Sequence, residues 1–243
     1  MKKFIRLLVC IMIAAAVGLT FFGCQNGNDD DNGDQTPKTD FELMSAALEK
    51  TNALESVKIE FTTLMELSTG GSMELAYVIT SAKQGLEFHA AGTSKVVIMP
   101  GMEIDTEMEM WGKDGKVYTI AGEQKTYIEQ PYSDMTGTHL ALEEEQLADF
   151  VKDGNVYTFK ISAADAAAAL GEGLDGTLGE DSYIEFEITQ NDAGYITKMV
   201  YSMLVSQGND TMQMDMEYTF SLFGEAEEIE FPDFTEFEEQ VQY

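Results

Sequence analysis

Residues 56–67 read SVKIEFTTLMEL, and this stretch decides the fold. Ile59, Phe61, Thr63, Met65 and Leu67 occupy every second position, with charged or polar residues at most of the positions between them. A period of two places successive side chains on opposite faces of a β-strand. The stretch therefore predicts a strand with one buried and one solvated face. The same alternation continues over most of the following chain and predicts a mostly β domain.

Four hairpins follow when apolar residues are placed opposite one another, because a slip of one residue turns every side chain to the other face. Together they predict an antiparallel meander, with further strands at 155–161 and 182–189. Around the loop at 69–71, Met65 is predicted opposite Leu75 and Phe61 opposite Ile79; around the loop at 113–115, Met110 is predicted opposite Tyr118 and Met108 opposite Ile120. Around the turn at 208–209, Met203 is predicted opposite Met214 and Tyr201 opposite Met216; around the turn at 191–194, Phe186 is predicted opposite Met199 and Ile184 opposite Tyr201.

Helical signals are few. Thr39 and Glu42 have the spacing of a capping box, and apolar residues at helical spacing follow them. Residues 140–151 predict a short acidic helix, and the alanine-rich residues 162–170 predict another. A sheet of about ten strands curls rather than staying flat. The fold class predicted is α+β and mostly β: one long, curled antiparallel sheet with a few helices against its apolar face.

One face of the predicted sheet is rich in methionine and aromatic side chains. Methionine is unbranched and polarisable, and it suits surfaces that repack around varied apolar partners. The face is either a lining for a greasy ligand or an ordinary core beneath the helices. Its members are Met65, Met73, Met102, Met108, Met110, Met199, Met203, Met212, Met214 and Met216, with Phe61, Tyr77, Tyr118, Phe186, Tyr201 and Tyr218.

The opposite face carries carboxylates, and strand alternation explains them as a solvated convex surface. A spacing of two spreads these groups along a strand without converging them on an ion, so no metal site is predicted. His89 and His139 have no partner at metal-ligand spacing. The acidic positions are Glu60, Glu66, Glu103, Asp105, Glu107, Glu109, Glu185, Glu187, Asp215 and Glu217.

The N-terminal segment has a basic start, an apolar run from Leu7 to Phe22, and then Gly23-Cys24. It resembles the signal of bacterial lipoproteins, in which this cysteine is lipidated and becomes the mature N-terminus. The resemblance implies a signal peptide at 1–23, the lipidated Cys24 with a flexible acidic tether at 24–39, and one domain at 40–243. It places the chain on the extracytoplasmic face of the cell membrane, held by its lipid. An uncleaved membrane anchor is the alternative.

Charge and motifs exclude several classes of function. The chain has 14 basic and 44 acidic residues, a formal net charge of −30. Such a surface repels nucleic acid and anionic headgroups, so binding to nucleic acid is not expected. Cys10 lies within the signal and lipid would consume Cys24, which leaves no disulfide or cysteine-based metal site. No nucleophile, phosphate-loop or zinc motif is present, so neither an enzyme nor a cofactor is predicted.

The stretches LESVKIEFTTLMEL at 54–67 and MEIDTEMEMWGKDGKVY at 102–118, behind a lipoprotein signal and a polar tether, resemble the LolA-type and LppX/LprAFG-type lipoprotein superfamily. The chain especially resembles its poorly characterised Gram-positive members. The resemblance implies an incomplete β-barrel with helices packed in its concave side. It also implies a hydrophobic cavity that carries lipids or lipoprotein acyl chains.

The leading hypothesis is a membrane-anchored extracytoplasmic lipoprotein that binds a lipid, an acyl chain or another hydrophobic small molecule on its concave face. The alternative is a structural or accessory envelope lipoprotein with a filled core, which acts through its acidic surface on a protein partner that the sequence does not identify. The predicted lining consists of Phe61, Met65, Tyr77, Met108, Met110, Tyr118, Phe186, Tyr201, Met203, Met214 and Met216.

Overall fold

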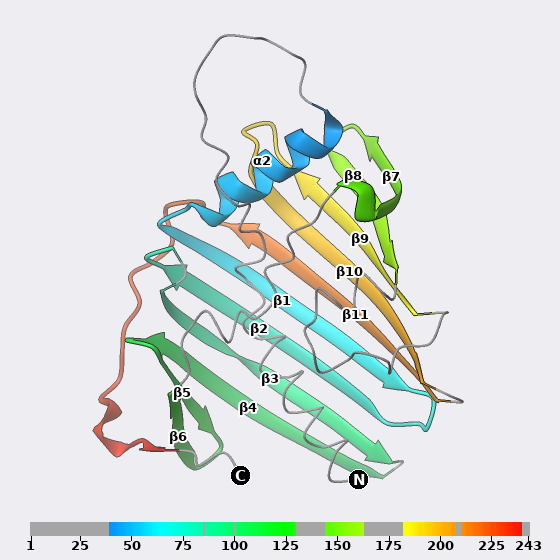
Figure 1. The fold of residues 1–243 in the computed structure, drawn as a ribbon. Helices are drawn as coiled ribbons and strands as arrows, with labels where there is room; N and C mark the ends of the chain where they lie inside the picture. The colour runs from blue at the N-terminus through cyan, green and yellow to red at the C-terminus, as the bar shows by residue number, and fades with distance from the viewer. Residues whose placement is uncertain are drawn as a thin grey trace.

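The computed structural model describes residues 39–84, 86–99, 101–129, 144–162, 182–207 and 210–239. These residues form one twelve-stranded sheet, one α-helix and two short 3₁₀ helices (Figure 1). The elements are α2 (Asp40–Asn52), β1 (Ser56–Leu67), β2 (Ser72–Ala82), β3 (Glu87–Met99), β4 (Met102–Lys113), β5 (Lys116–Ala121), β6 (Gln124–Glu129), η1 (Glu144–Gln146), β7 (Leu147–Asp153), β8 (Val156–Ser162), β9 (Tyr183–Gln190), β10 (Ile196–Gln207), β11 (Asp210–Ser221), η2 (Phe234–Glu236) and β12 (Glu238–Glu239).

The sheet consists of two antiparallel meanders. Its strand order is β12-β6-β5-β4-β3-β2-β1-β11-β10-β9-β8-β7. Strands β1 to β6 form one meander, β7 to β11 form the other, and the pairing of β1 with β11 joins them. The sheet curls without closing, with β12 and β7 at its two edges (Figure 1). The curled, mostly β architecture predicted from the sequence is therefore present.

Helix α2 begins where the sequence predicts. The Thr39 hydroxyl accepts a hydrogen bond from the Glu42 amide, and the Glu42 carboxylate accepts one from the Thr39 amide, which completes the capping box. The helix lies across one end of the sheet (Figure 1). Its first turn reaches β7 through an ion pair of Asp40 with Lys152 at 3.0 Å. Its last turn reaches β10, where the Thr51 hydroxyl accepts a hydrogen bond from the Ile196 amide at 2.8 Å.

The observed registers agree with one prediction and correct three. The β10–β11 pairs are as predicted, with Met203 opposite Met214. The β1–β2 register differs by two residues, and Met65 lies opposite Met73. The β9–β10 register also differs by two residues, and a bulge interrupts this ladder after Ile196. A shift of two leaves every side chain on its predicted face because the alternation repeats every two residues.

The β4–β5 hairpin differs by one residue, which changes a face. Asp114 and Gly115 form a two-residue turn in which both φ angles are positive, at 53° and 72°. Asp-Gly favours this type I′ turn, whereas the prediction used a three-residue loop. Trp111 therefore lies opposite Tyr118, on the outer face. The prediction that Tyr118 lines the inner face is wrong.

The two faces are otherwise distributed as the alternation predicts. The inner face holds the core, and Phe61, Met65 and Tyr218 are almost fully buried there. The predicted carboxylates point to the outer face, and Glu107 and Glu217 are exposed. Met102 is an exception among the predicted inner residues, because it is the first residue of β4 and is 48% exposed.

The expected helices other than α2 are corrected or untested. Of residues 140–151, those from Glu144 form a 3₁₀ turn and then strand β7. The strand pairs with β8, so cross-strand hydrogen bonds override the local helical preference. Residues 163–170 of the second expected helix lie outside the described residues, as do residues 1–38 with Cys24. "A few helices" thus becomes one α-helix in the described part of the chain.

The segment after β11 was not anticipated from the sequence. It leads from Ser221 past the ends of β1 and β2 to the edge of the first meander, where β12 pairs in parallel with β6 (Figure 1). We call residues 225–239 the C-terminal strap. Within the described ranges, no helix is long and apolar enough to cross a membrane.

Candidate ligand-binding face

The inner face carries a row of four methionines on four adjacent strands. Met73, Met65, Met214 and Met203 are register partners across β2, β1, β11 and β10. Their side chains are 0%, 1%, 5% and 8% exposed. Directly paired residues on one face bring their side chains into contact. The result is a continuous thioether surface, which we call the methionine row.

A second row, two residues further along each strand, carries hydroxyl groups. Ser94 and Thr106 are partners on β3 and β4, and Thr63 and Tyr201 follow on β1 and β10. Leu75 separates Ser94 from Thr63, and Met216 separates Thr63 from Tyr201. We call these four residues the hydroxyl row. Ser94 and Thr63 place hydroxyl groups in the middle of an otherwise apolar face, while the Tyr201 hydroxyl donates to the Met199 sulfur at 3.8 Å.

Tyr77 shows how aromatic rings are accommodated on this face. Its partner on β3 is Gly92, and a Cβ atom there would lie 2.0 Å from the Ala76 carbonyl oxygen and 2.6 Å from Cδ1 of Tyr77. The ring therefore occupies the space that a side chain would fill. Its hydroxyl donates to the thioether sulfur of Met108 on β4 at 3.3 Å, and sulfur is a weak acceptor. Burial raises the pKa of Tyr77 to about 12.

Aromatic contacts bind the two meanders together at the centre of the sheet. The rings of Phe61 on β1 and Tyr218 on β11 lie 4.7 Å apart. Tyr201 meets Phe186 edge-on with ring centroids 4.8 Å apart. Burial raises the pKa of both Tyr201 and Tyr218. These hydroxyls thus stay neutral within an apolar environment.

Ten of the eleven predicted lining residues lie on this face. Met108 and Met216 are partly buried there, and the other eight are buried. Tyr118 is the exception, because the two-residue Asp114-Gly115 turn places it on the outer face. Sequence reasoning did not single out Thr63 and Ser94, although their place in the alternation puts them on this face.

On the outer face, the C-terminal strap covers an aromatic cluster. Tyr118 stacks on Phe234 with ring centroids 3.7 Å apart, and Trp111 donates its indole N–H to the Glu230 carbonyl at 3.2 Å. Beside them lies a cavity of about 610 Å³, between the strap and the part of the sheet that carries Trp111 and His89. The Asp114-Gly115 turn, and phenylalanines three residues apart at 231, 234 and 237, were the available sequence signals.

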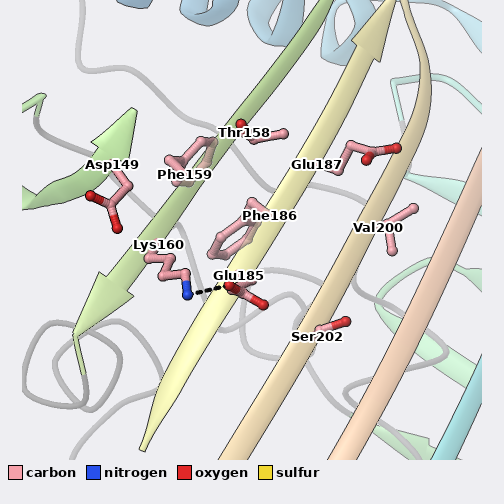
Figure 2. Close-up of a pocket in the computed structure, with 9 residues that line it drawn as sticks. All are labelled: Asp149, Thr158, Phe159, Lys160, Glu185, Phe186, Glu187, Val200 and Ser202. Atoms are coloured by element: carbon pink, nitrogen blue, oxygen red, sulfur yellow. Dashed lines mark ion pairs between the residues drawn. The ribbon is translucent and has the colours of Figure 1, made fainter. Parts of the chain in front are cut away.

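A second outer-face cavity, of about 340 Å³, lies over β8 to β10 (Figure 2). Thr158, Lys160, Glu185 and Ser202 contribute polar side chains to it, and the Lys160 ammonium pairs with the Glu185 carboxylate. Such a lining does not suit an apolar ligand. Within the described residues no group of three or more His, Cys, Asp or Glu side chains is placed to hold a metal ion.

Comparisons with known proteins give weak matches to structures. No family model matches the chain, and no curated protein matches it. A LolA superfamily protein from Nitrosomonas europaea is 9% identical with a TM-score of 0.27, and the match covers 74% of this chain and 96% of that one. A beta-barrel-like protein of a domain of unknown function, DUF1849, from Brucella abortus is 10% identical with a TM-score of 0.23, over 69% and 98%.

With TM-scores of 0.27 and 0.23, neither match carries an argument about the fold or the function of this chain. The geometry of the inner face is the feature of this chain that bears on its function.

Proposed function

We propose that this chain is a non-enzymatic binding protein that takes a hydrophobic ligand, such as a lipid or an acyl chain, on the inner face of its open sheet. The methionine row is the observation that carries the proposal. A core that needs only to be filled is served by Leu, Ile and Val, which hold fixed rotamers. Four unbranched thioethers in register instead give a surface that changes shape around a guest.

Binding follows from the burial of apolar area, at about 25 cal/mol per Å². The inner side chains are buried in the structure, so a guest is admitted only if they rearrange. Met65 and Met214 are neighbours and each has three rotatable side-chain bonds, so they adapt without moving the strands. No covalent step is part of this function.

We also propose that Cys24 is lipidated and holds the domain at the extracytoplasmic face of the cell membrane. The basic start, the apolar run and Gly23-Cys24 support this proposal. Metabolic labelling with a tagged fatty acid tests it. Label should enter the full chain and be lost in Cys24→Ser, while Cys10→Ser should retain it. Labelling that survives Cys24→Ser excludes lipidation at this cysteine.

Native mass spectrometry of the full chain, purified without detergent, tests ligand binding. We expect the wild-type protein to carry a hydrophobic molecule. Met65→Gln, which keeps the side-chain length and adds polarity to the methionine row, should lose it. Glu66→Gln is the matched control, because Glu66 is the next residue and points to the outer face. Circular dichroism establishes that both variants are folded. A ligand-free wild-type protein contradicts the proposal.

The second candidate is an accessory envelope protein with a filled core that acts on a protein partner. The nearly complete burial of the inner face favours it. It predicts a ligand-free protein whose acidic outer face binds a basic partner. That interaction would weaken steeply as salt concentration increases, because exposed charges are screened.

A further inference from the structure

Thr63 carries a buried hydroxyl that makes no hydrogen bond. The residue is 3% exposed and lies in β1, near the middle of the strand order. Its Oγ1 atom has no partner within the described residues. A buried hydroxyl without a partner destabilises a folded protein, and valine has nearly the same shape without this cost. The packing of the core therefore does not explain why threonine occupies this position.

The neighbours of Thr63 on the sheet offer its hydroxyl no strong hydrogen-bonding group. Its partners on the adjacent strands are Leu75 and Met216, which present hydrocarbon and a thioether. Phe61 and Met65 precede and follow it on the same face of β1. The missing partner is therefore an atom that a bound molecule can bring. Because threonine both donates and accepts, an ester or carboxyl oxygen satisfies it.

The arrangement of the two rows predicts how a ligand that carries this oxygen is oriented on the inner face. The hydroxyl row crosses the face from Thr106 and Ser94 to Thr63 and Tyr201. The methionine row lies two residues from it along each strand, about 7 Å away. A guest on this face thus meets hydroxyl groups along one line and only apolar side chains along the next.

We propose that the Thr63 hydroxyl donates a hydrogen bond to the oxygen-bearing end of the ligand, whose chain lies along the methionine row. The ligand class is then an acyl chain that ends in an ester or a carboxyl group, and not a plain hydrocarbon. This inference rests on the proposed function and adds the chemistry that Thr63 recognises.

The test compares three probes of equal chain length on the full-length protein: hexadecane, methyl palmitate and palmitic acid. Affinities are measured by displacement of an apolar fluorescent probe. The variants are Thr63→Val, which removes the hydroxyl, and Thr63→Ser, which keeps it. Thr62→Val is the matched control, because Thr62 is the neighbouring residue on the exposed outer face.

We expect Thr63→Val to bind methyl palmitate or palmitic acid about three- to tenfold more weakly, the effect of one lost hydrogen bond. Its affinity for hexadecane should not change, and Thr63→Ser and Thr62→Val should resemble the wild type. Weakening on methyl palmitate alone identifies an ester as the ligand, and weakening on palmitic acid alone identifies a carboxyl group. The unliganded Thr63→Val variant should be at least as stable as the wild type.

Two results overturn the inference alone. One is an unchanged affinity of Thr63→Val for both oxygen-bearing probes, and the other is equal weakening on all three. A wild-type protein that binds none of the probes overturns the proposed function as well. A Thr63→Val protein less stable than the wild type would show that the hydroxyl serves the fold.

Discussion

Tyr118 of β5 stacks on Phe234 of the C-terminal strap, with ring centroids 3.7 Å apart and planes 14° apart. The contact fastens the last described segment of the chain to the outer face of the first meander. Phe237 is buried next to it, and Lys125 pairs with Glu236 at 2.5 Å. The strap therefore covers outer-face aromatic rings and, through β12, protects the edge of β6.

The Phe234→Ala variant should loosen the strap. The ring is partly buried, so we expect a loss of about 1–3 kcal/mol in the free energy of unfolding, below the cost at a full core site. Trp111 is the single tryptophan of the chain and contacts both Phe234 and the strap backbone. Its fluorescence emission should shift to longer wavelength before global unfolding. Thr235→Ala, at an exposed position, is the control, and an unchanged emission in Phe234→Ala contradicts the docked strap.

The Gly112→Ala variant should crowd the inner face. A Cβ atom at Gly112 would lie 2.1 Å from Cε1 of Phe88, which is its register partner. Overpacking of this kind costs about 1–3 kcal/mol. Urea unfolding of Gly112→Ala, Phe88→Ala and the double variant measures the coupling. The double variant should be destabilised by less than the sum of the single changes, because the clash disappears with the ring. Additive effects would show that the two residues do not compete for this space.

The Thr51→Val variant should detach α2 from the sheet. The Thr51 hydroxyl donates to the Ala47 carbonyl and accepts from the Ile196 amide, each at 2.8 Å. Valine leaves the buried Ile196 N–H without a partner, which costs about 1–3 kcal/mol. Thermal unfolding measures the loss, and hydrogen exchange at Ile196 should become faster. Thr51→Ser retains the hydroxyl and should recover most of the stability. Wild-type stability and unchanged hydrogen exchange at Ile196 in Thr51→Val would contradict the role of the hydroxyl in holding α2 to the sheet.

The Met214→Asp and Glu107→Lys variants test the assignment of the two faces. Met214 is 5% exposed and belongs to the methionine row, so a carboxylate there should prevent folding or abolish ligand binding. Glu107 is exposed on the outer face, and Glu107→Lys should change the free energy of unfolding by no more than about 0.5 kcal/mol. Circular dichroism and urea unfolding compare them. The opposite ranking of the two variants would mean that the faces are inverted.

The buried tyrosines should make the protein sensitive to alkali. Burial raises the pKa of Tyr77 to about 12, whereas tyrosine in an unfolded chain ionises near pH 10. Between about pH 10 and 12 the unfolded state releases a proton that the folded state keeps. The free energy of unfolding is therefore undiminished below pH 10 and falls as the pH rises through this window.

Urea unfolding at increasing pH, with tyrosinate absorbance as a second signal, measures this loss. Tyr201 and Tyr218, whose pKa values burial also raises, add to the slope. Tyr77→Phe removes one of the tyrosines whose pKa is raised by burial and should make the pH dependence shallower. The same slope in Tyr77→Phe and the wild type would rule out a contribution from Tyr77.

How far the sequence predicts the site differs from strand to strand. On β1, β2, β10 and β11 a strict alternation places Phe61, Met65 and Met214 on the inner face even where the register is two residues off. On β5 a single residue in the turn decides the face of Tyr118, and counting apolar pairs does not distinguish a two-residue loop from a three-residue loop. The preference of Asp-Gly for positive φ was the better guide there.

Several features have no local signal of this kind. The pairing of β1 with β11 joins residues about 150 positions apart, such as Met65 and Met214. The conversion of residues 147–151 from an expected helix into part of strand β7 depends on β8 as a partner. The place of the strap depends on aromatic rings that the sheet first has to bring together.

The sequence by itself determined the two-residue period. With it, the sequence determined which side chains lie on the apolar face of the sheet and which lie on the anionic face, because the alternation is a property of each strand alone. The tertiary structure decided which strands are neighbours and how far they are offset. A shift of two residues preserves the faces, so only the packing of whole strands distinguishes one register from the next. The methionine row and the surroundings of the unpartnered Thr63 hydroxyl both depend on the alignment of four neighbouring strands.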